Sequence, residues 1–438
     1  MEKPTYTYID LFAGAGGLSE GFRRAGFMPI AHVEMDPAAC NTLKTRNAFY
    51  WLKKQGKFGI YQAYLNGELD RFELYESVPA DVLDSVLNFE ISNKTLDDIF
   101  ERIDHLNKGS IDLIIGGPPC QAYSLAGRSR DKNRMRDDKR NHLYRQYGRF
   151  LERYEPQYFV FENVLGLLSA KNKNGSFYID VMKRYFRKKG YAIDYRLVSA
   201  DCYGVPQKRK RVIIIGKRIE KGKRATLDFY PEFCNRGFQQ NSFTIKDLFA
   251  DLPPLKAGEG KHCSAKTIMP RNNAGLLISL GIIDETAPNS VTFHIARNHT
   301  DTDLKIYKIA AELWESKGER LSYASLPEEL IQHNNTTSFL DRYKVVDGDA
   351  FASQTVVAHI YKDGHYYIHP DLEQNRSITP REAARLQTFP DDYFFESVSG
   401  KPSITAAYKQ IGNAVPVLLA ETIANSMKGL LHEEKRQF

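Results

Sequence analysis

A strand that runs directly into a glycine-rich turn is the feature that most constrains the fold of this chain. TYTYIDLF (residues 5–12) has the apolar character of a buried strand, and AGAGG follows it at once. Residues 18–25 then have the spacing of an amphipathic helix. In such a unit the glycines let the backbone approach a ligand at the carboxyl end of the strand. We therefore expect an α/β protein built around this turn.

The same alternation continues along the first half of the chain. Further strands are predicted at residues 29–33, 111–115, 158–161, 191–198 and 211–215, and helices at 148–154 and 178–189. This pattern is typical of a doubly wound parallel sheet, in which ligands bind at the carboxyl ends of the strands.

Two regions depart from the alternation. Residues 47–108 are predicted to form a long, mostly helical insertion. From 217 to 375 the pattern is lost, and we expect a separate, smaller domain with a helix at 303–316 and late strands at 353–360 and 365–369. Beyond it, Thr-Pro-Arg-Glu begins a helix at 379–389, and a packed helix is predicted at 414–431.

Composition narrows the class of protein. The 438 residues are 42% hydrophobic and 26% charged, as in soluble globular proteins, and no apolar run reaches the roughly 18 residues of a membrane span. The start lacks a signal pattern, and the five cysteines form no CxxC pair, which argues against disulfides or zinc. We expect a cytoplasmic enzyme with no metal and no membrane contact.

The net charge of +7 is mild and by itself does not indicate nucleic-acid binding. The clustering of basic residues at 128–145 and 208–211 matters more than this total.

The glycine-rich turn and a later acid together predict an adenosine-containing cofactor. Glu34 follows the second predicted strand, twenty positions after Gly14, where a carboxylate can accept hydrogen bonds from ribose hydroxyls. The turn lacks the Lys-Ser/Thr of a phosphate-gripping loop, which disfavours ATP hydrolysis. It also lacks GxGxxG, which disfavours a flavin or nicotinamide oxidoreductase.

A cysteine, an acid and two arginines follow other strands of the predicted sheet. Cys120 ends GGPPC after the 111–115 strand and precedes the densest basic run, which would lower the pKa of its thiol from about 8.5. Glu162 ends the 158–161 strand and, between apolar walls, would hold or donate a proton. Arg209 and Arg211 add positive charge. These residues suggest covalent catalysis on an electron-poor ring, with a structural ion-pair network as the alternative.

The motifs now allow a comparison with a known family. In the family's own order the chain contains DLFAGAGG (10–17), GGPPCQAYS (116–124), RNHLY (140–144), FENV (161–164), YGVPQKRKR (203–211), TPREAARLQTFPDDY (379–393) and QIGNAVP (410–416). With these blocks the chain resembles the DNA (cytosine-5)-methyltransferases of bacterial restriction-modification systems, which use S-adenosylmethionine.

The resemblance implies a Rossmann-like methyltransferase sheet with a second, smaller DNA target-recognition domain. It places the catalytic domain at residues 1–220, the target-recognition domain at 221–375, and a hinge with the returning C-terminal helix at 376–438. The residues that it assigns to cofactor binding are Phe12, Ala13, Gly14, Ala15, Gly16, Gly17, Glu34, Met35, Pro119, Leu143, Asn413, Ala414 and Val415.

The resemblance also implies a reaction. Cys120 would attack carbon 6 of a flipped cytosine, Glu162 would contact the ring nitrogen and amino group, and Arg209 and Arg211 would hold the nucleotide. The implied partners are double-stranded DNA and, functionally, a restriction endonuclease of the same specificity, with the enzyme acting as a monomer.

Some points depart from the family pattern or leave alternatives open. Glu90 and Asp112 are the candidates for an acid at the adenine amino group. Possible DNA contacts in the second domain are Arg297, His299, Arg342, Lys344, His359 and Lys362. The main alternative is a transfer-RNA cytosine-5 methyltransferase, although Tyr203-Gly204 and the long variable region favour DNA. A catalytically silent DNA-binding homologue would be expected to lose Cys120 or Glu162, and both are present.

Overall fold

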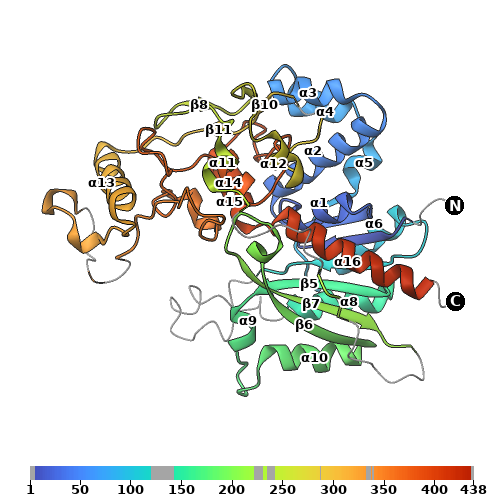
Figure 1. Cartoon of the computed structure of the whole chain (residues 1–438). Coiled ribbons are helices and arrows are strands. Elements are labelled where there is room, and N and C mark those ends of the chain that lie inside the picture. The colour runs from blue at the N-terminus through green and yellow to red at the C-terminus, as the bar shows by residue number, and fades with distance from the viewer. Residues whose placement is uncertain are drawn as a thin grey trace.

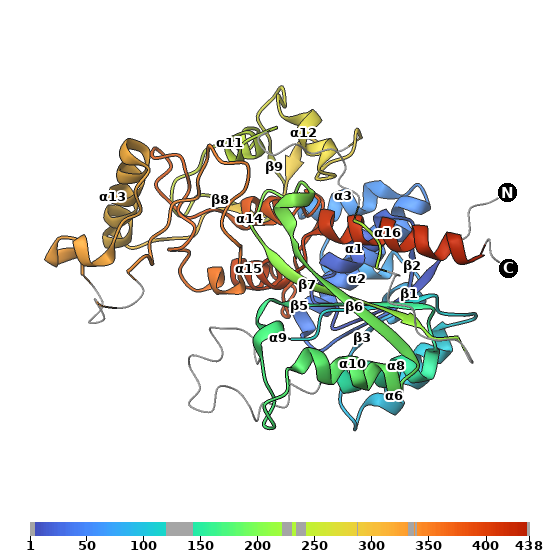
Figure 2. The same cartoon turned by 60° about the horizontal axis from the view of Figure 1, so that its bottom comes forward.

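A computed structural model describes residues 5–119, 143–220, 230–233, 242–286, 288–331, 337 and 340–435, with side chains as far as 433. Within these ranges a seven-stranded sheet has the order β3-β2-β1-β4-β5-β7-β6 (Figures 1 and 2). Its strands are β1 (Thr7–Leu11), β2 (Met28–Glu34), β3 (Val86–Asn88), β4 (Leu113–Gly116), β5 (Tyr158–Val164), β6 (Tyr191–Ser199) and β7 (Lys210–Arg218). The doubly wound fold is thereby confirmed.

The direction of β7 differs from the predicted all-parallel sheet. β7 pairs antiparallel with both β5 and β6, whereas the other neighbouring strands pair in parallel. The cause is the short link between β6 and β7, which holds only the 3-10 turn η2 (Ala200–Tyr203) and six further residues. A parallel return needs a crossover of a dozen or more residues, so the chain turns back as a hairpin.

Helices cover both faces of the sheet. One face packs on α6 (Leu96–Leu106), α8 (Leu143–Tyr154), the short α9 (Gly166–Ser169) and α10 (Tyr178–Lys188). The other packs on α1 (Gly17–Arg24), α2 (Pro37–Lys54) and α16 (Val417–Lys435). Along β4, Leu113 and Ile115 face one core and Ile114 faces the other. This alternation is the two-residue period of a strand buried on both sides.

The predicted insertion is smaller than residues 47–108. Its first part continues α2, and its last part supplies β3 and α6, which belong to the sheet and its cover. What remains is α3 (Phe58–Asn66), α4 (Arg71–Glu76) and α5 (Ala80–Asp84). Tyr64 and Arg71 from this group bond the buried carboxylate of Glu396, so the helices brace the C-terminal part of the chain.

The rest of the chain forms a lobe with little regular structure (Figure 1). It holds α11 (Ile245–Phe249), α12 (Ala274–Ser279), α13 (Asp301–Lys317), the 3-10 turns η3 (Tyr323–Ser325), η4 (Glu328–Leu330) and η5 (Ala358–Tyr361), and two two-stranded ladders. The ladders pair β8 (Gly260–Lys261) with β11 (His294–Ile295) and β9 (Ala265–Lys266) with β10 (Ser290–Val291). The late strands predicted at 353–360 and 365–369 are wrong, because these residues form η5 and isolated bridges.

The lobe is less separate than expected. Phe243, Leu248 and Phe293 belong to the same hydrophobic cluster as one face of the sheet, whereas α13 packs in a small cluster with Tyr323 and Tyr343. After the lobe the chain returns through α14 (Pro380–Leu386) and α15 (Ile404–Asn413) to α16. Thr379 caps α14, as its sequence predicted, and forms a capping box with Glu382, although the helix ends at Leu386 rather than at 389.

Candidate functional site

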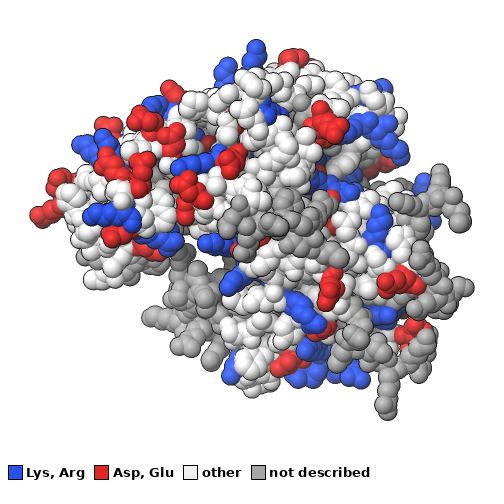
Figure 3. All heavy atoms as spheres, in the orientation of Figure 1, with Lys and Arg blue, Asp and Glu red and all other residues white. Residues whose placement is uncertain are grey.

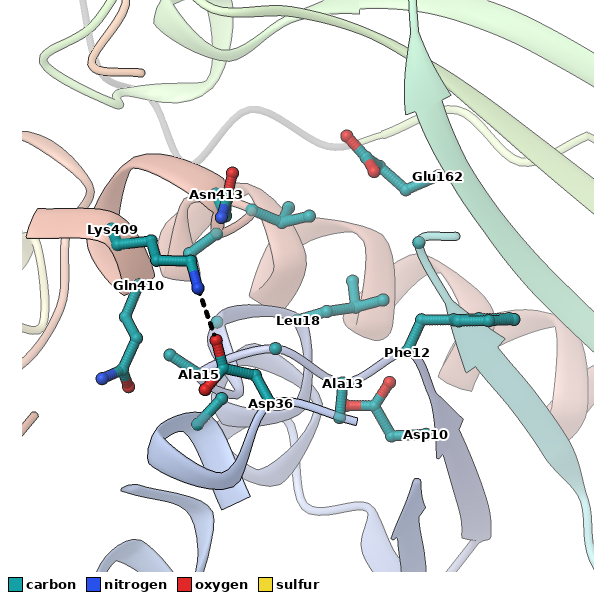
Figure 4. A pocket seen from close by; sticks show the side chains of 16 residues that line it. Asp10, Phe12, Ala13, Ala15, Leu18, Asp36, Glu162, Lys409, Gln410 and Asn413 are labelled. Atoms are coloured by element: carbon teal, nitrogen blue, oxygen red, sulfur yellow. Dashed lines mark hydrogen bonds and ion pairs between the residues drawn. The ribbon is translucent and has the colours of Figure 1, made fainter. Parts of the chain in front are cut away.

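A pocket lies where the strand order reverses, at the carboxyl ends of β1, β4 and β5 (Figure 4). It encloses about 610 Å³ of empty space, its open mouth included. The lining residues are Asp10, Phe12, Ala13, Gly14, Ala15, Gly17, Leu18, Asp36, Ala39, Gly117, Glu162, Lys409, Gln410, Asn413, Ala414 and Val415. The glycine-rich block (10–17) and the C-terminal block (410–416) of the sequence therefore line the same cavity.

The glycine-rich loop needs its glycines for two reasons. Gly14 and Gly16 have φ values of 54° and 81°, in the left-handed region that side chains rarely adopt. At Gly17 a Cβ atom would lie 2.4 Å from the carbonyl oxygen of Val415, so only glycine allows the C-terminal segment to approach this closely. The loop is thus shaped both for a sharp turn and for contact with residues 414–415.

Glu34 supports the loop from β2. Its Oε2 accepts a hydrogen bond of 2.8 Å from the backbone N–H of Gly14, and its Oε1 accepts from those of Met35 and Asp36, also at 2.8 Å. Burial raises the pKa of Glu34, and these hydrogen bonds oppose the rise. Glu34 does not itself line the cavity, so in this structure its carboxylate organises the loop next to the pocket.

Asp10 is a site residue that sequence reasoning did not single out. It is 1% exposed, and neither carboxyl oxygen has a hydrogen-bond partner among the described residues. Burial, and then the charge of Glu34, raise the pKa of Asp10 well above its usual value. An unpartnered buried carboxyl is costly, and this one lines the pocket (Figure 4). It is therefore available to a cationic or hydrogen-bond-donating ligand group.

Glu162 lines the pocket from the same sheet edge as Asp10, and it pairs with Arg211. Oε1 of Glu162 lies 2.6 Å from Nε of Arg211, and both side chains are largely buried. Arg211 lies opposite Val164 in the β5–β7 ladder. Glu162 precedes Val164 by two residues on β5, so its side chain points to the same face of the sheet as that of Arg211. The reversed β7 makes this possible, because a parallel β7 would carry Arg211 to the far edge of the sheet. Glu162 was expected between apolar walls and instead faces a guanidinium.

The segment that leads to Cys120 is held against Glu162. A Cβ atom on Gly117 would lie 2.8 Å from Oε2 of Glu162, so the chain passes close to this carboxylate. The buried Asn163 donates from Nδ2 to the carbonyl oxygen of Pro118 at 3.5 Å. Cys120 itself, and the basic run 128–140, lie outside the described residues. The structure therefore places Pro119, immediately before the cysteine, at the same edge as Glu162.

Arg209 does not share the position of Arg211. It is 2% exposed, and it donates to the carbonyl oxygens of Val356 at 2.7 Å and Gly412 at 3.2 Å. Its guanidinium thus joins three distant segments of the chain. We expected Arg209 to hold the nucleotide, but these buried contacts give it a structural role instead.

The C-terminal wall is held by hydrogen bonds from the 379–393 block. Nε2 of Gln387 donates to the carbonyl oxygens of Ile411 at 2.8 Å and Ala414 at 3.4 Å. The hydroxyl of Tyr393 donates to the carbonyl oxygen of Ala15 at 2.6 Å. One buried block therefore fixes both the glycine-rich loop and the 411–415 segment.

Several expected cofactor residues do not line the pocket: Gly16, Glu34, Met35, Pro119 and Leu143. Met35 is 57% exposed beside the mouth residue Asp36.

Of the candidate acids for the adenine amino group, Asp112 is excluded by its position. It bonds Thr7 at the amino ends of β1 and β4, whereas the pocket lies at their carboxyl ends. Glu90 follows β3 and is exposed, and it does not line the pocket.

Two of the possible DNA contacts are already used inside the second lobe. Arg297 donates to the carbonyl oxygens of Ile360, Tyr361 and Lys362. His299 bonds Ser377.

Within the described ranges no three His, Cys, Asp or Glu side chains form a group that would hold a metal ion. None of the helices that the structure describes has the length and apolar character to cross a bilayer.

Comparison with known proteins fits this geometry. The family model for C-5 cytosine-specific DNA methylase matches residues 6–59 and 85–429. The unmatched stretch, 60–84, holds most of α3 and all of α4 and α5. The family match therefore includes β3 and α6, and the internal stretch that it leaves out is most of the small helical group.

Individual relatives match along nearly the whole chain. The type II methyltransferase M.Bpa9945I of Bacillus paralicheniformis is 39% identical over 97% of this chain and 99% of its own length. M.DdeI of Desulfomicrobium norvegicum is 29% identical over 95% of this chain and 87% of its own. Among solved structures, a candidate DNA modification methyltransferase encoded within an E. coli prophage matches with a TM-score of 0.61 and 25% identity, over 98% of this chain and all of its own.

Proposed function

This chain belongs to the C-5 cytosine-specific DNA methylases and is a DNA cytosine-5-methyltransferase, and on that premise we propose that its pocket binds S-adenosylmethionine and that Cys120 is the nucleophile. The observation that carries the proposal is the convergence of the glycine-rich loop, Glu162 and the 413–415 segment on one cavity. The second lobe, in this proposal, recognises the DNA sequence.

The described residues fit such a cofactor. Asp10 offers an unpartnered buried carboxyl inside the pocket, suited to a cationic group. None of the described residues lies within 4 Å of where a Cβ atom of Gly14 would be, so they leave open space on that side of the loop. The residues that would hold the cofactor are Asp10, Phe12 to Gly17, Glu34 and Asn413 to Val415, and the bound cofactor would supply an electrophilic methyl group.

The protein's own residues would activate the cytosine. The Cys120 thiolate adds to carbon 6, and the ring nitrogen takes up a proton with the help of Glu162, which sits at the same sheet edge as Pro119. After carbon 5 gains the methyl group, a water molecule takes its proton, the bond between sulfur and carbon 6 breaks to restore the thiolate, and the ring nitrogen returns its proton toward Glu162. In this proposal Arg211 orients Glu162, which its ion pair with that carboxylate supports, and contacts the base.

The target base would have to leave the DNA stack, because carbon 5 and carbon 6 cannot be reached inside a duplex. Base flipping costs a few kcal/mol, which contacts with the phosphate backbone can offset. Lysine and arginine side chains, among others, border the recess between the two lobes (Figure 3). Binding should therefore weaken steeply with salt.

The direct test is methyl transfer from labelled S-adenosylmethionine to genomic DNA and, separately, to transfer RNA. We expect label on DNA as 5-methylcytosine, identified by mass, and loss of transfer in Cys120→Ala. Cys202→Ala is the matched control, because Cys202 is a free exposed thiol that does not line the pocket. Label on RNA alone would overturn the proposed substrate, and an active Cys120→Ala would overturn the nucleophile.

We also propose that the enzyme, acting as a monomer in the cytoplasm, protects DNA from a restriction endonuclease of the same specificity. The names of the type II relatives support this pairing. Bisulfite mapping would first identify the methylated sequence. An endonuclease that recognises this sequence should then fail to cut DNA from cells that express the enzyme, and normal cutting would refute protection.

A further inference from the structure

An ion pair spans the mouth of the pocket. Lys409 on α15 and Asp36 at the start of α2 both line the cavity, and Nζ of Lys409 lies 2.8 Å from Oδ2 of Asp36 (Figure 4). The two side chains come from opposite walls. Asp36 follows the Glu34 strand, whereas Lys409 precedes the 413–415 segment. The pair therefore joins the two halves of the site across the space that a ligand must enter.

The backbone on each side of this pair is fixed. Oδ1 of Asp36 accepts from the N–H of Ala38 and caps α2. Gln410, next to Lys409, accepts from Thr42 at 2.6 Å and donates to the carbonyl oxygen of Glu396 at 2.8 Å, and both bonds are buried. The Lys409 side chain is 52% exposed. The part that can move is thus this side chain, while the helices stay in place.

We propose that Lys409 and Asp36 form a latch that narrows the mouth of the pocket in the empty enzyme and opens for the cofactor. The inference rests on the proposed function of the pocket. An exposed ion pair of this kind favours its closed form by roughly 1.5-fold to fivefold. The fraction of open molecules scales the apparent affinity, so breaking the latch should speed ligand association by at most this factor.

The test measures the binding kinetics of S-adenosylhomocysteine on immobilised enzyme, which requires no methyl transfer. Lys409→Met keeps the length of the side chain and removes its charge. Asp36→Asn removes the other charge and keeps a good helix cap. In both variants we expect faster association at low salt, by up to about fivefold, with unchanged dissociation. The difference should fade at roughly 0.5 M salt, where the wild-type pair is screened.

Lys53→Met is the matched control. Lys53 pairs with Asp284 at the same 2.8 Å, with side chains 50% and 49% exposed, and neither residue lines this pocket. Its association rate should equal that of the wild type. Unchanged association in Lys409→Met would overturn the latch, and so would faster dissociation, which would make Lys409 a ligand contact. If the wild type fails to bind the probe, the proposed cofactor fails instead.

Discussion

The two walls of the pocket treat their polar groups in opposite ways. On the sheet side, Asp10 has no hydrogen-bond partner among the described residues, and Glu162 bonds a partly exposed arginine. On the C-terminal side, Gln387 and Tyr393 are buried and donate to backbone carbonyl oxygens. The first wall keeps its polar groups for a ligand, whereas the second uses them to fix the shape of the site.

The buried charged side chains behind the C-terminal wall also bond to other parts of the protein and so fix its shape. Arg385 makes bidentate contacts with Asp251 and Asp391, all within 3.0 Å, and none of the three is exposed by more than 5%. Asp251 belongs to the second lobe, and Asp391 to the segment that follows it. The difference between the walls predicts that sheet-side substitutions will remove activity first and C-terminal ones will remove stability first.

The largest effect on the sheet side is expected from Glu162→Gln. It removes the group that shares a proton with the base, and the rate of methyl transfer should fall by about 10²–10⁴-fold. Single-turnover kinetics at saturating cofactor would measure this rate. S-adenosylhomocysteine affinity and the melting temperature should stay close to those of the wild type. A variant that loses its melting transition would instead place Glu162 with the structural residues.

Arg209 and Arg211 offer a matched pair, two residues apart, for the same contrast. Arg209→Met leaves two buried carbonyl oxygens without donors and should lower the free energy of unfolding by roughly 2–5 kcal/mol. Arg211→Met should cost less stability than Arg209→Met, because its ion pair with Glu162 is partly exposed, and should reduce methyl transfer. Denaturant unfolding and single-turnover assays on both variants would decide. Equal stability losses would remove the distinction between the two arginines.

This pair also shows how far the sequence could take the prediction. Both arginines belong to one motif, and only the direction of β7 separates Arg211, which lies on that strand beside Glu162, from Arg209, which precedes it. The apolar runs of β1, β4 and β5 were long enough to predict. β3 has three residues, too few to show a period, and the second lobe is built mostly from loops. Asp10 was missed because the sequence shows neither that its carboxyl group is buried nor that this group has no hydrogen-bond partner among the described residues.

Asp10 makes the stability of the empty enzyme depend on pH. Burial raises the pKa of Asp10 in the folded state, so the folded protein keeps its proton at pH values where the unfolded chain has released it. Stability should therefore fall as pH rises from the unfolded value of about 3.8 to the raised folded value. Asp10→Asn cannot lose this proton.

Melting temperatures of the wild type and Asp10→Asn, measured without cofactor from pH 4 to pH 8, should consequently diverge. The variant should become the more stable protein toward high pH while binding S-adenosylhomocysteine more weakly. Parallel curves would show that the carboxyl is satisfied in the empty enzyme, and would remove it from the ligand-binding wall.

The smallest effect is expected from Tyr393→Phe, which tests how the structural wall reaches the ligand. The change removes one buried hydrogen bond to Ala15 and should cost about 0.5–1.5 kcal/mol of stability. Tyr191→Phe is its control, because Tyr191 donates to the carbonyl oxygen of Pro156 at 2.7 Å, away from the pocket. Both variants should melt earlier by similar amounts, but only Tyr393→Phe should weaken S-adenosylhomocysteine binding, by about two- to tenfold, since Ala15 lines the pocket. Equal binding in the two variants would mean that the C-terminal wall stabilises the fold without shaping the glycine-rich loop.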